Sequence, residues 1–222
     1  MTTLNELLDR LYAASAAQEP QLAAYFAHGP SAPAGGGAIS SDDPHRFLAD
    51  KLVALDRDKA TFCQQLCIAL RAKRIVEAGT SYGVSTLQLA HAVQMVAESD
   101  GKPGIVIATE HEPQKAAIAR QNLDTANLSA LVDLREGDLR ETLQVIEGPV
   151  DFALIDIWTD MARPALELIA PHLRPGAVVV ADNTASHAGG YADYFDFIRS
   201  PGNGLVTQTL PFDGGLELTV KL

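Results

Sequence analysis

The chain has 222 residues, and its formal net charge at pH 7 is −11. This acidic balance excludes a nucleic-acid backbone as the main partner, because phosphate contacts require basic patches, and it argues against an anionic membrane surface. No apolar run approaches the roughly 18 residues of a membrane span. No signal-peptide pattern opens the chain, so we expect a cytoplasmic protein without a membrane partner.

The N-terminal segment is predicted to form an amphipathic helix. Thr3 and Glu6 have the spacing of a capping box, and apolar residues recur at helical spacing from Leu4 to Tyr12. Such a stripe ahead of a complete α/β unit has no obvious place in that core, so we expect it to form a homodimer contact. The stretch from His28 to Pro44 is rich in Gly, Pro and Ser and indicates a flexible lid. Residues 1–60 are therefore interpreted as N-terminal helices with a lid, and residues 61–222 as the main domain.

The rest of the chain alternates between helical and strand patterns. Helices are expected at 44–57 and 60–71, and Cys63 and Cys67 in the second are expected to be reduced packing residues. Only five residues, from Pro211 to Gly215, separate the last two strands, which indicates a hairpin. The pattern predicts an α/β fold with a Rossmann-like, doubly wound, mostly parallel seven-stranded sheet and an antiparallel edge hairpin. Strands are expected near 74–78, 104–109, 131–135, 150–156, 176–181, 204–210 and 215–221. Helical segments are expected near 84–98, 113–126, 139–146, 161–171 and 190–199.

A glycine turn after the first strand indicates a nucleoside site. Gly79 can adopt backbone angles closed to other residues, and the helix that follows presents unpaired N–H groups. Glu110 ends the second strand, where a carboxylate can accept two hydrogen bonds from a ribose diol. The dinucleotide fingerprint needs three glycines, whereas this turn has only Gly79 and Gly83 and follows an acid, Glu77, so NAD is disfavoured.

This turn resembles the first motif of class I S-adenosylmethionine (SAM) methyltransferases, and the resemblance implies that residues 61–222 form a SAM-binding methyltransferase domain. The resemblance implies that Glu77 and Gly79 face the methionine part of SAM and that Glu110 holds its ribose. Gly137–Asp138 looks like the turn whose Asp accepts a hydrogen bond from adenine, although Asp138 could equally serve as a helix N-cap. The full set of expected SAM-binding residues is Glu77, Gly79, Thr80, Ser81, Tyr82, Gly83, Ser85, Glu110, His111, Gly137, Asp138, Asp156 and Trp158.

Three oxygen donors follow two of the predicted strands. Asp156 comes after the fourth strand and Asp182–Asn183 after the fifth, and such donors suit Mg²⁺ or Ca²⁺. From Arg74 onward the order of these segments resembles the catechol and caffeoyl-CoA type O-methyltransferases. That resemblance implies that Asp156, Asp182 and Asn183 bind the metal and that Trp158 lies near the adenine.

The resemblance also implies a mechanism and exposes one departure. In the family, a divalent cation acidifies a hydroxyl of a vicinal diol and orients it toward the sulfonium methyl. A Lys three residues after the first metal Asp assists deprotonation, but this chain has Thr159 there. Asp156 and His187 are the catalytic candidates, with His187 or water taking the proton, although His187 could equally be an exposed loop residue.

Two functions remain open. The favoured one is a SAM-dependent methyltransferase that acts on an oxygen of a small, phenolic acceptor. The alternative is a SAM-binding regulatory or scaffolding protein without metal-assisted catalysis, which Thr159 favours.

Overall fold

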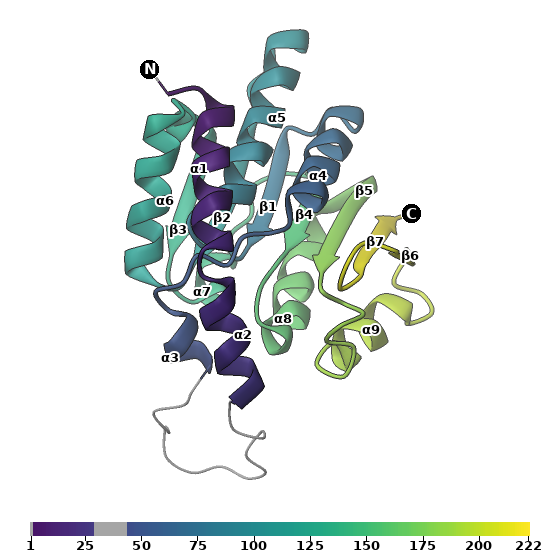
Figure 1. Ribbon diagram of the computed structural model, residues 1–222. Helices are drawn as coiled ribbons and strands as arrows, with labels where there is room; N and C mark the ends of the chain where they lie inside the picture. The colour runs from purple at the N-terminus through teal and green to yellow at the C-terminus, as the bar shows by residue number, and fades with distance from the viewer. Residues whose placement is uncertain (1, 29–43) are drawn as a thin grey trace.

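A computed structural model describes residues 2–28 and 44–222 and contains one seven-stranded sheet. The strand order is β3-β2-β1-β4-β5-β7-β6, and only β7 and β6 run antiparallel to their neighbours, at one edge (Figure 1). This confirms the predicted doubly wound sheet with an edge hairpin. The strands are β1 (Arg74–Ala78), β2 (Ile105–Glu110), β3 (Val132–Glu136), β4 (Val150–Ile155), β5 (Leu173–Asp182), β6 (Leu205–Leu210) and β7 (Leu216–Lys221).

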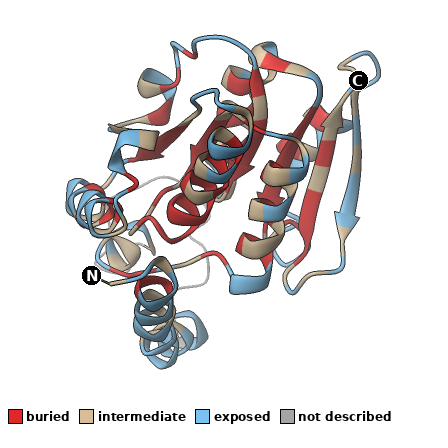
Figure 2. Cartoon of the chain, turned by 90° about the horizontal axis from the view of Figure 1, so that it is seen from above, coloured by how far each residue is buried: buried red, intermediate tan, exposed pale blue. Residues whose placement is uncertain are grey.

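Helices cover both faces of the sheet, so the central strands are buried on both sides (Figure 2). One apolar cluster joins the sheet to α1, α4 and α5, and a second joins the opposite face to α7, α8 and α9. The helices are α1 (Leu4–Ala16), α2 (Glu19–His28), α3 (Pro44–Leu48), α4 (Arg57–Ala69), α5 (Val84–Asp100), α6 (Pro113–Thr125), α7 (Leu139–Thr142), α8 (Thr159–Ile169) and α9 (Ala192–Arg199).

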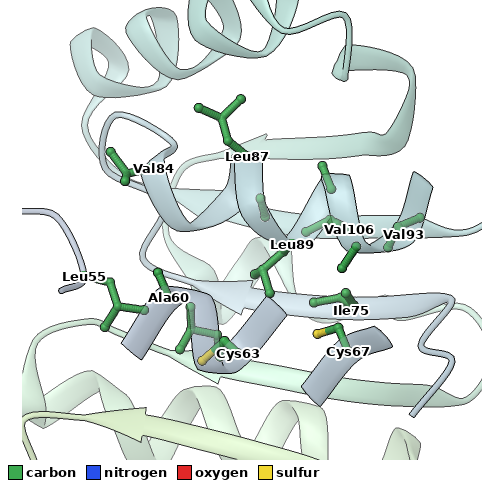
Figure 3. Packing of buried hydrophobic residues seen from close by; sticks show 14 of the residues in the cluster. Leu55, Ala60, Cys63, Cys67, Ile75, Val84, Leu87, Leu89, Val93 and Val106 are labelled. Atoms are coloured by element: carbon green, nitrogen blue, oxygen red, sulfur yellow. The ribbon is translucent and has the colours of Figure 1, made fainter. Parts of the chain in front are cut away.

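The packing of α4 and α5 on the sheet is close and almost wholly apolar (Figure 3). Ala60, Cys63 and Cys67 of α4 lie against the core, and both cysteines are free thiols, as expected. The boundary drawn between residues 60 and 61 falls inside α4, within this core. The division of the chain into two parts stays a prediction.

The first helix has the predicted capping box, with Thr3 and Glu6 bonded reciprocally. Its apolar stripe is covered within the chain, because Leu7 and Leu8 are buried in the cluster that contains α5. The reason given for a dimer contact on this stripe was therefore wrong: the stripe has a place in the monomer core. The homodimer itself stays a prediction.

The segment before α4 differs from the predicted helix over 44–57. Helix α3 ends at Leu48, and residues 51–56 are irregular. The backbone of Leu52 bonds to the side chains of Ser15 and Gln18, at the end of α1, while Leu52 and Leu55 are buried. These contacts replace the helical hydrogen bonds of this segment. The predicted lid lies outside the described residues, apart from its ends at His28 and Pro44.

No helix within residues 2–28 and 44–222 combines the length and apolar character needed to cross a membrane.

Candidate active site

Four acidic residues lie at or next to the carboxyl ends of four neighbouring strands, and they share one face of the sheet. Side chains alternate along a strand, so Glu77, Glu110, Asp156 and Asp182 have the same orientation as Ile75, Val106, Leu154 and Val180, which belong to the α1–α4–α5 cluster. The carboxyl ends of parallel strands are where open α/β sheets bind ligands. The sheet therefore places a row of carboxylates at its ligand-binding edge.

The turn after β1 depends on Gly79. Its φ is +98°, and a Cβ atom there would lie 1.9 Å from the main-chain oxygen of Asp156. Only glycine lets the turn approach the end of β4 this closely. Thr80 N donates to the Thr109 carbonyl at 3.0 Å, which ties the turn to β2. Gly83, with φ +85°, is the N-cap residue of α5.

Glu77 is fully buried, and hydroxyl groups surround its carboxylate. Ser85 donates to Oε1 at 2.6 Å, while Thr80 at 3.2 Å and Thr86 donate to Oε2. Burial outweighs these three bonds and raises the pKa of Glu77 to about 7. The carboxylate thus fixes the turn and the start of α5. Its expected contact with the methionine part of SAM stays a prediction.

Glu110 is held by two backbone amides. Ser81 N donates to Oε2 at 2.7 Å, and Glu112 N donates to Oε1 at 2.8 Å. Ser81 has φ +50°, so the turn is shaped to deliver its amide. Each carboxylate oxygen can accept more than one hydrogen bond, which leaves capacity for a ribose diol. His111 follows on the surface.

The structure places Asp138 at the N-cap of α7. Its Oδ1 accepts from Arg140 N at 2.9 Å, and the Arg140 side chain also bonds to the carboxylate. These bonds lower the pKa of Asp138 to about 2. Gly137 N donates to the Glu110 carbonyl at 2.9 Å, so the adenine and ribose candidates are neighbours. The helix-cap alternative is confirmed, while the adenine contact stays a prediction.

The segment that precedes α4 covers part of this edge (Figure 1). His45 of α3 lies against the ring of Trp158, with ring centroids 3.9 Å apart. The Tyr82 hydroxyl donates to the Asp50 carbonyl at 3.1 Å. Two expected SAM-binding residues thus contact the chain next to the predicted lid.

Asp156 and Asp182 lie close enough to influence each other electrostatically. Burial and the neighbouring carboxylates of Asp182 and Glu77 raise the pKa of Asp156 well above its ordinary value. Burial also raises the pKa of Asp182, against the opposing effect of Lys59. Lys59 Nζ lies 2.7 Å from Asp182 Oδ1. The Lys59 ammonium therefore acts electrostatically on the carboxylates of both Asp156 and Asp182.

The predicted metal ligands are partly brought together. Asp182 Oδ1 is buried and accepts no hydrogen bond of good geometry, so it retains capacity for a cation. Asn183 has φ +56°, and its Oδ1 lies beside Gly214 of the turn between β6 and β7. Among the described residues no group of three His, Cys, Asp or Glu side chains could hold a metal. Carboxylate and amide oxygens are the donors that a hard cation prefers, and metal binding by Asp156, Asp182 and Asn183 stays a prediction.

Thr159 lies where the family Lys would be, and it packs against the main chain. A Cβ at Gly190 would be 2.5 Å from Thr159 Oγ1. His187 is exposed, its Nδ1 lies 2.9 Å from Ser186 Oγ, and its amide bonds to the Asn183 carbonyl. These contacts are those of a loop residue, and a catalytic role for His187 stays a prediction.

Sequence reasoning missed two residues of this site. Lys59 comes from α4, ahead of the glycine turn and of every strand, and nothing in its local pattern distinguishes it from a surface lysine. Tyr191 is the N-cap residue of α9, and it is buried. Asp156 and Asp182 are close enough to add to burial in raising the pKa of its phenol. Only the fold reveals that both side chains lie near the carboxylates.

Comparison with known proteins identifies the region that carries this site. A family model described as a methyltransferase domain matches residues 76–184. The chain is 34% identical over 139 residues to catechol O-methyltransferase of Niastella koreensis, covering 59% of this chain and 58% of that protein. It is 30% identical over 145 residues to catechol O-methyltransferase of Mycobacterium tuberculosis, covering 65% and 63%. The matches thus span less than two thirds of both relatives.

A solved structure agrees with these matches. The O-methyltransferase from Bacillus cereus in complex with SAH has a TM-score of 0.68 and 25% sequence identity, covering 76% of this chain and 83% of that one. Fold, site and comparisons point the same way: residues 76–184 match a methyltransferase domain, and the chain is similar to catechol O-methyltransferases and to a solved O-methyltransferase in complex with SAH.

Proposed function

We propose that this protein transfers a methyl group from SAM to a hydroxyl oxygen of a small, phenolic molecule. The observation that carries the proposal is the row of carboxylates at the carboxyl edge of the sheet, beside a glycine turn. The catechol O-methyltransferase relatives support the same reaction class.

Each part of the edge has a proposed task. Glu110 accepts hydrogen bonds from the ribose hydroxyls, while the Ser81 and Glu112 amides keep its carboxylate in place. The open turn at Gly79 admits the methionine part next to Asp156. Trp158 borders the adenine, and the ring of His45 lies against Trp158. SAM, when bound, supplies an electrophilic methyl group on a sulfonium.

The transfer requires little covalent chemistry from the chain. The acceptor oxygen forms a bond to the methyl carbon as the carbon–sulfur bond breaks, and that electron pair stays on sulfur. The acceptor proton leaves to water or to His187. The carboxylates of Asp156 and Asp182 stabilise the positive charge of the sulfonium and orient the acceptor.

A divalent ion is proposed to bind Asp156, Asp182 and Asn183. The buried Asp182 Oδ1 and the mutual repulsion of the two carboxylates support this donor set. The ion, when bound, would lower the pKa of the acceptor hydroxyl. Mg²⁺ or Ca²⁺ suits oxygen ligands of this kind.

The second candidate function is a SAM-binding regulatory or scaffolding protein. Thr159 favours it, because a hydroxyl packed against Gly190 cannot replace the Lys of the family as a base. The deciding experiment is methyl transfer to a panel of phenols and catechols with and without EDTA, alongside SAH binding. Product formation supports the enzyme; SAH binding without any product supports the alternative.

Two further features are proposed. The protein is a cytoplasmic homodimer, and the family resemblance and the exposed side chains of Phe26 and Val53 support self-association. The division into N-terminal helices with a lid over residues 1–60 and a methyltransferase domain over residues 61–222 is likewise proposed. Sedimentation at micromolar concentration tests the dimer: a monomer contradicts it.

A further inference from the structure

Lys59 is a buried cation within the site that the predicted ligands form. Its side chain is 1% exposed, and α4 brings it to the carboxyl edge of the sheet. Its Nζ lies 2.7 Å from Asp182 Oδ1 and 3.1 Å from Asp56 Oδ2. Asp182 is 4% exposed, whereas the Asp56 side chain is largely exposed. The buried part of this contact is therefore the pair with Asp182.

The ion pair uses the oxygen that a metal would need. Asp182 Oδ1 is the atom nearest the ammonium, and it has no hydrogen bond of good geometry. The ammonium is itself a cation, so a divalent ion on the same oxygen would be repelled by it at short range. The two cations cannot both occupy the near side of Asp182 without a cost.

The charges around Lys59 point the same way. Asp182 and Asp56 raise the pKa of Lys59, and among the described residues Lys59 is the cation that lowers the pKa values of Asp156 and Asp182. With Lys59 in place, the two carboxylates of Asp156 and Asp182 and the ammonium together carry a formal charge of −1. Without it the pair carries −2, which attracts a divalent ion more strongly.

We propose that Lys59 is the resident cation of the catalytic centre and that it limits divalent-ion affinity by holding Asp182. A metal ion binds only when the ammonium moves away from Asp182 Oδ1. The inference rests on the proposed function for the identity of the metal ligands. It gives Lys59 a positioning role, because the residue acts through Asp182.

The test is calorimetric titration of Mg²⁺, and separately Mn²⁺, into the wild-type chain and Lys59→Met. Methionine keeps a similar length and removes the charge. We expect Lys59→Met to bind the ion at least about tenfold more tightly than the wild type, a difference of about 1.4 kcal/mol. The matched control is Lys73→Met, because Lys73 pairs with Asp100 at 2.8 Å at the opposite end of β1. The control should keep wild-type affinity.

A second variant keeps the inference testable if Lys59→Met does not fold. In Asp56→Asn the ammonium loses its exposed partner and is left to Asp182 alone, so metal affinity should not exceed that of the wild type. Higher affinity in Asp56→Asn, or equal or weaker affinity in a folded Lys59→Met, would overturn the inference. So would the absence of metal binding in both the wild type and Lys59→Met.

SAH binding, measured on the same samples without metal, separates this inference from the proposed function. If the wild type does not bind SAH, the proposed function fails. If SAH binds and only the order of metal affinities is wrong, Lys59 is a structural ion pair and the proposed function stands.

Discussion

Glu77 should make the stability of this protein fall as the pH rises. Its carboxyl is fully buried, and burial raises its pKa to about 7 from an ordinary value of 4.5. Between these two values the folded chain holds a proton that the unfolded chain has released. The contribution of Glu77 to the stability is therefore greatest below pH 4.5 and declines as the pH rises through 7.

The size of the effect follows from the shift. Each pKa unit corresponds to 1.36 kcal/mol, so a shift of this size amounts to about 3 kcal/mol in the free energy of unfolding. Glu77→Gln removes the titration and keeps the shape of the side chain. Its amide can still accept from Ser85 or Thr86, while the hydroxyl that faces the new NH₂ group rotates to accept.

The assay is urea unfolding of the wild type and Glu77→Gln from pH 5 to pH 8.5. The difference between the two chains cancels every other titrating group to a first approximation. We expect wild-type stability to fall relative to Glu77→Gln by about 3 kcal/mol over this range. A difference that is constant with pH, or that changes with the opposite sign, would refute the reasoning that burial outweighs the three hydroxyl donors.

Three further outcomes are expected. Gly79→Ala should destabilise the chain by more than about 3 kcal/mol in urea unfolding, because its Cβ would meet the Asp156 carbonyl and its φ is positive; a loss under 1 kcal/mol would contradict this. Glu110→Gln should weaken SAM binding by about 1.5–3 kcal/mol in calorimetry, and unchanged affinity would remove Glu110 from the ribose site. Leu8→Ala should cost about 2–4 kcal/mol in the monomer, as Leu8 is buried against the core; an effect that depends on protein concentration would instead place it in a dimer contact.

The sheet was predictable because each strand carries its own signal. β1 was predicted with the observed bounds, and the short connection after Pro211 correctly identified the antiparallel edge. Position at a strand end also identified Glu110, Asp156 and Asp182, since the carboxyl edge of a parallel sheet collects such residues. These inferences need only local periodicity and one topological rule.

The N-terminal segment was not predictable in the same way. The apolar stripe of α1 reads identically whether it packs on α5 or on another subunit, because periodicity shows that a face is apolar but not what covers it. Residues 51–56 leave the predicted helix because the Ser15 and Gln18 side chains offer their backbone other partners. Both outcomes depend on contacts between distant parts of the chain.

Lys59 shows why the electrostatics of the site needed the fold. The sequence shows that Thr159 stands in place of the family Lys, but it does not show which basic residue lies near the two carboxylates. The structure supplies one, because Lys59 reaches Asp182 from a helix that precedes β1. The same helix joins the N-terminal segment to the core, so the position of the ammonium depends on how α4 packs against α5. The net charge at the carboxyl ends of the strands therefore depends on a residue that precedes all of the strand-end motifs in the sequence. Substitutions in the core around α4 should alter metal affinity, because they would move Lys59.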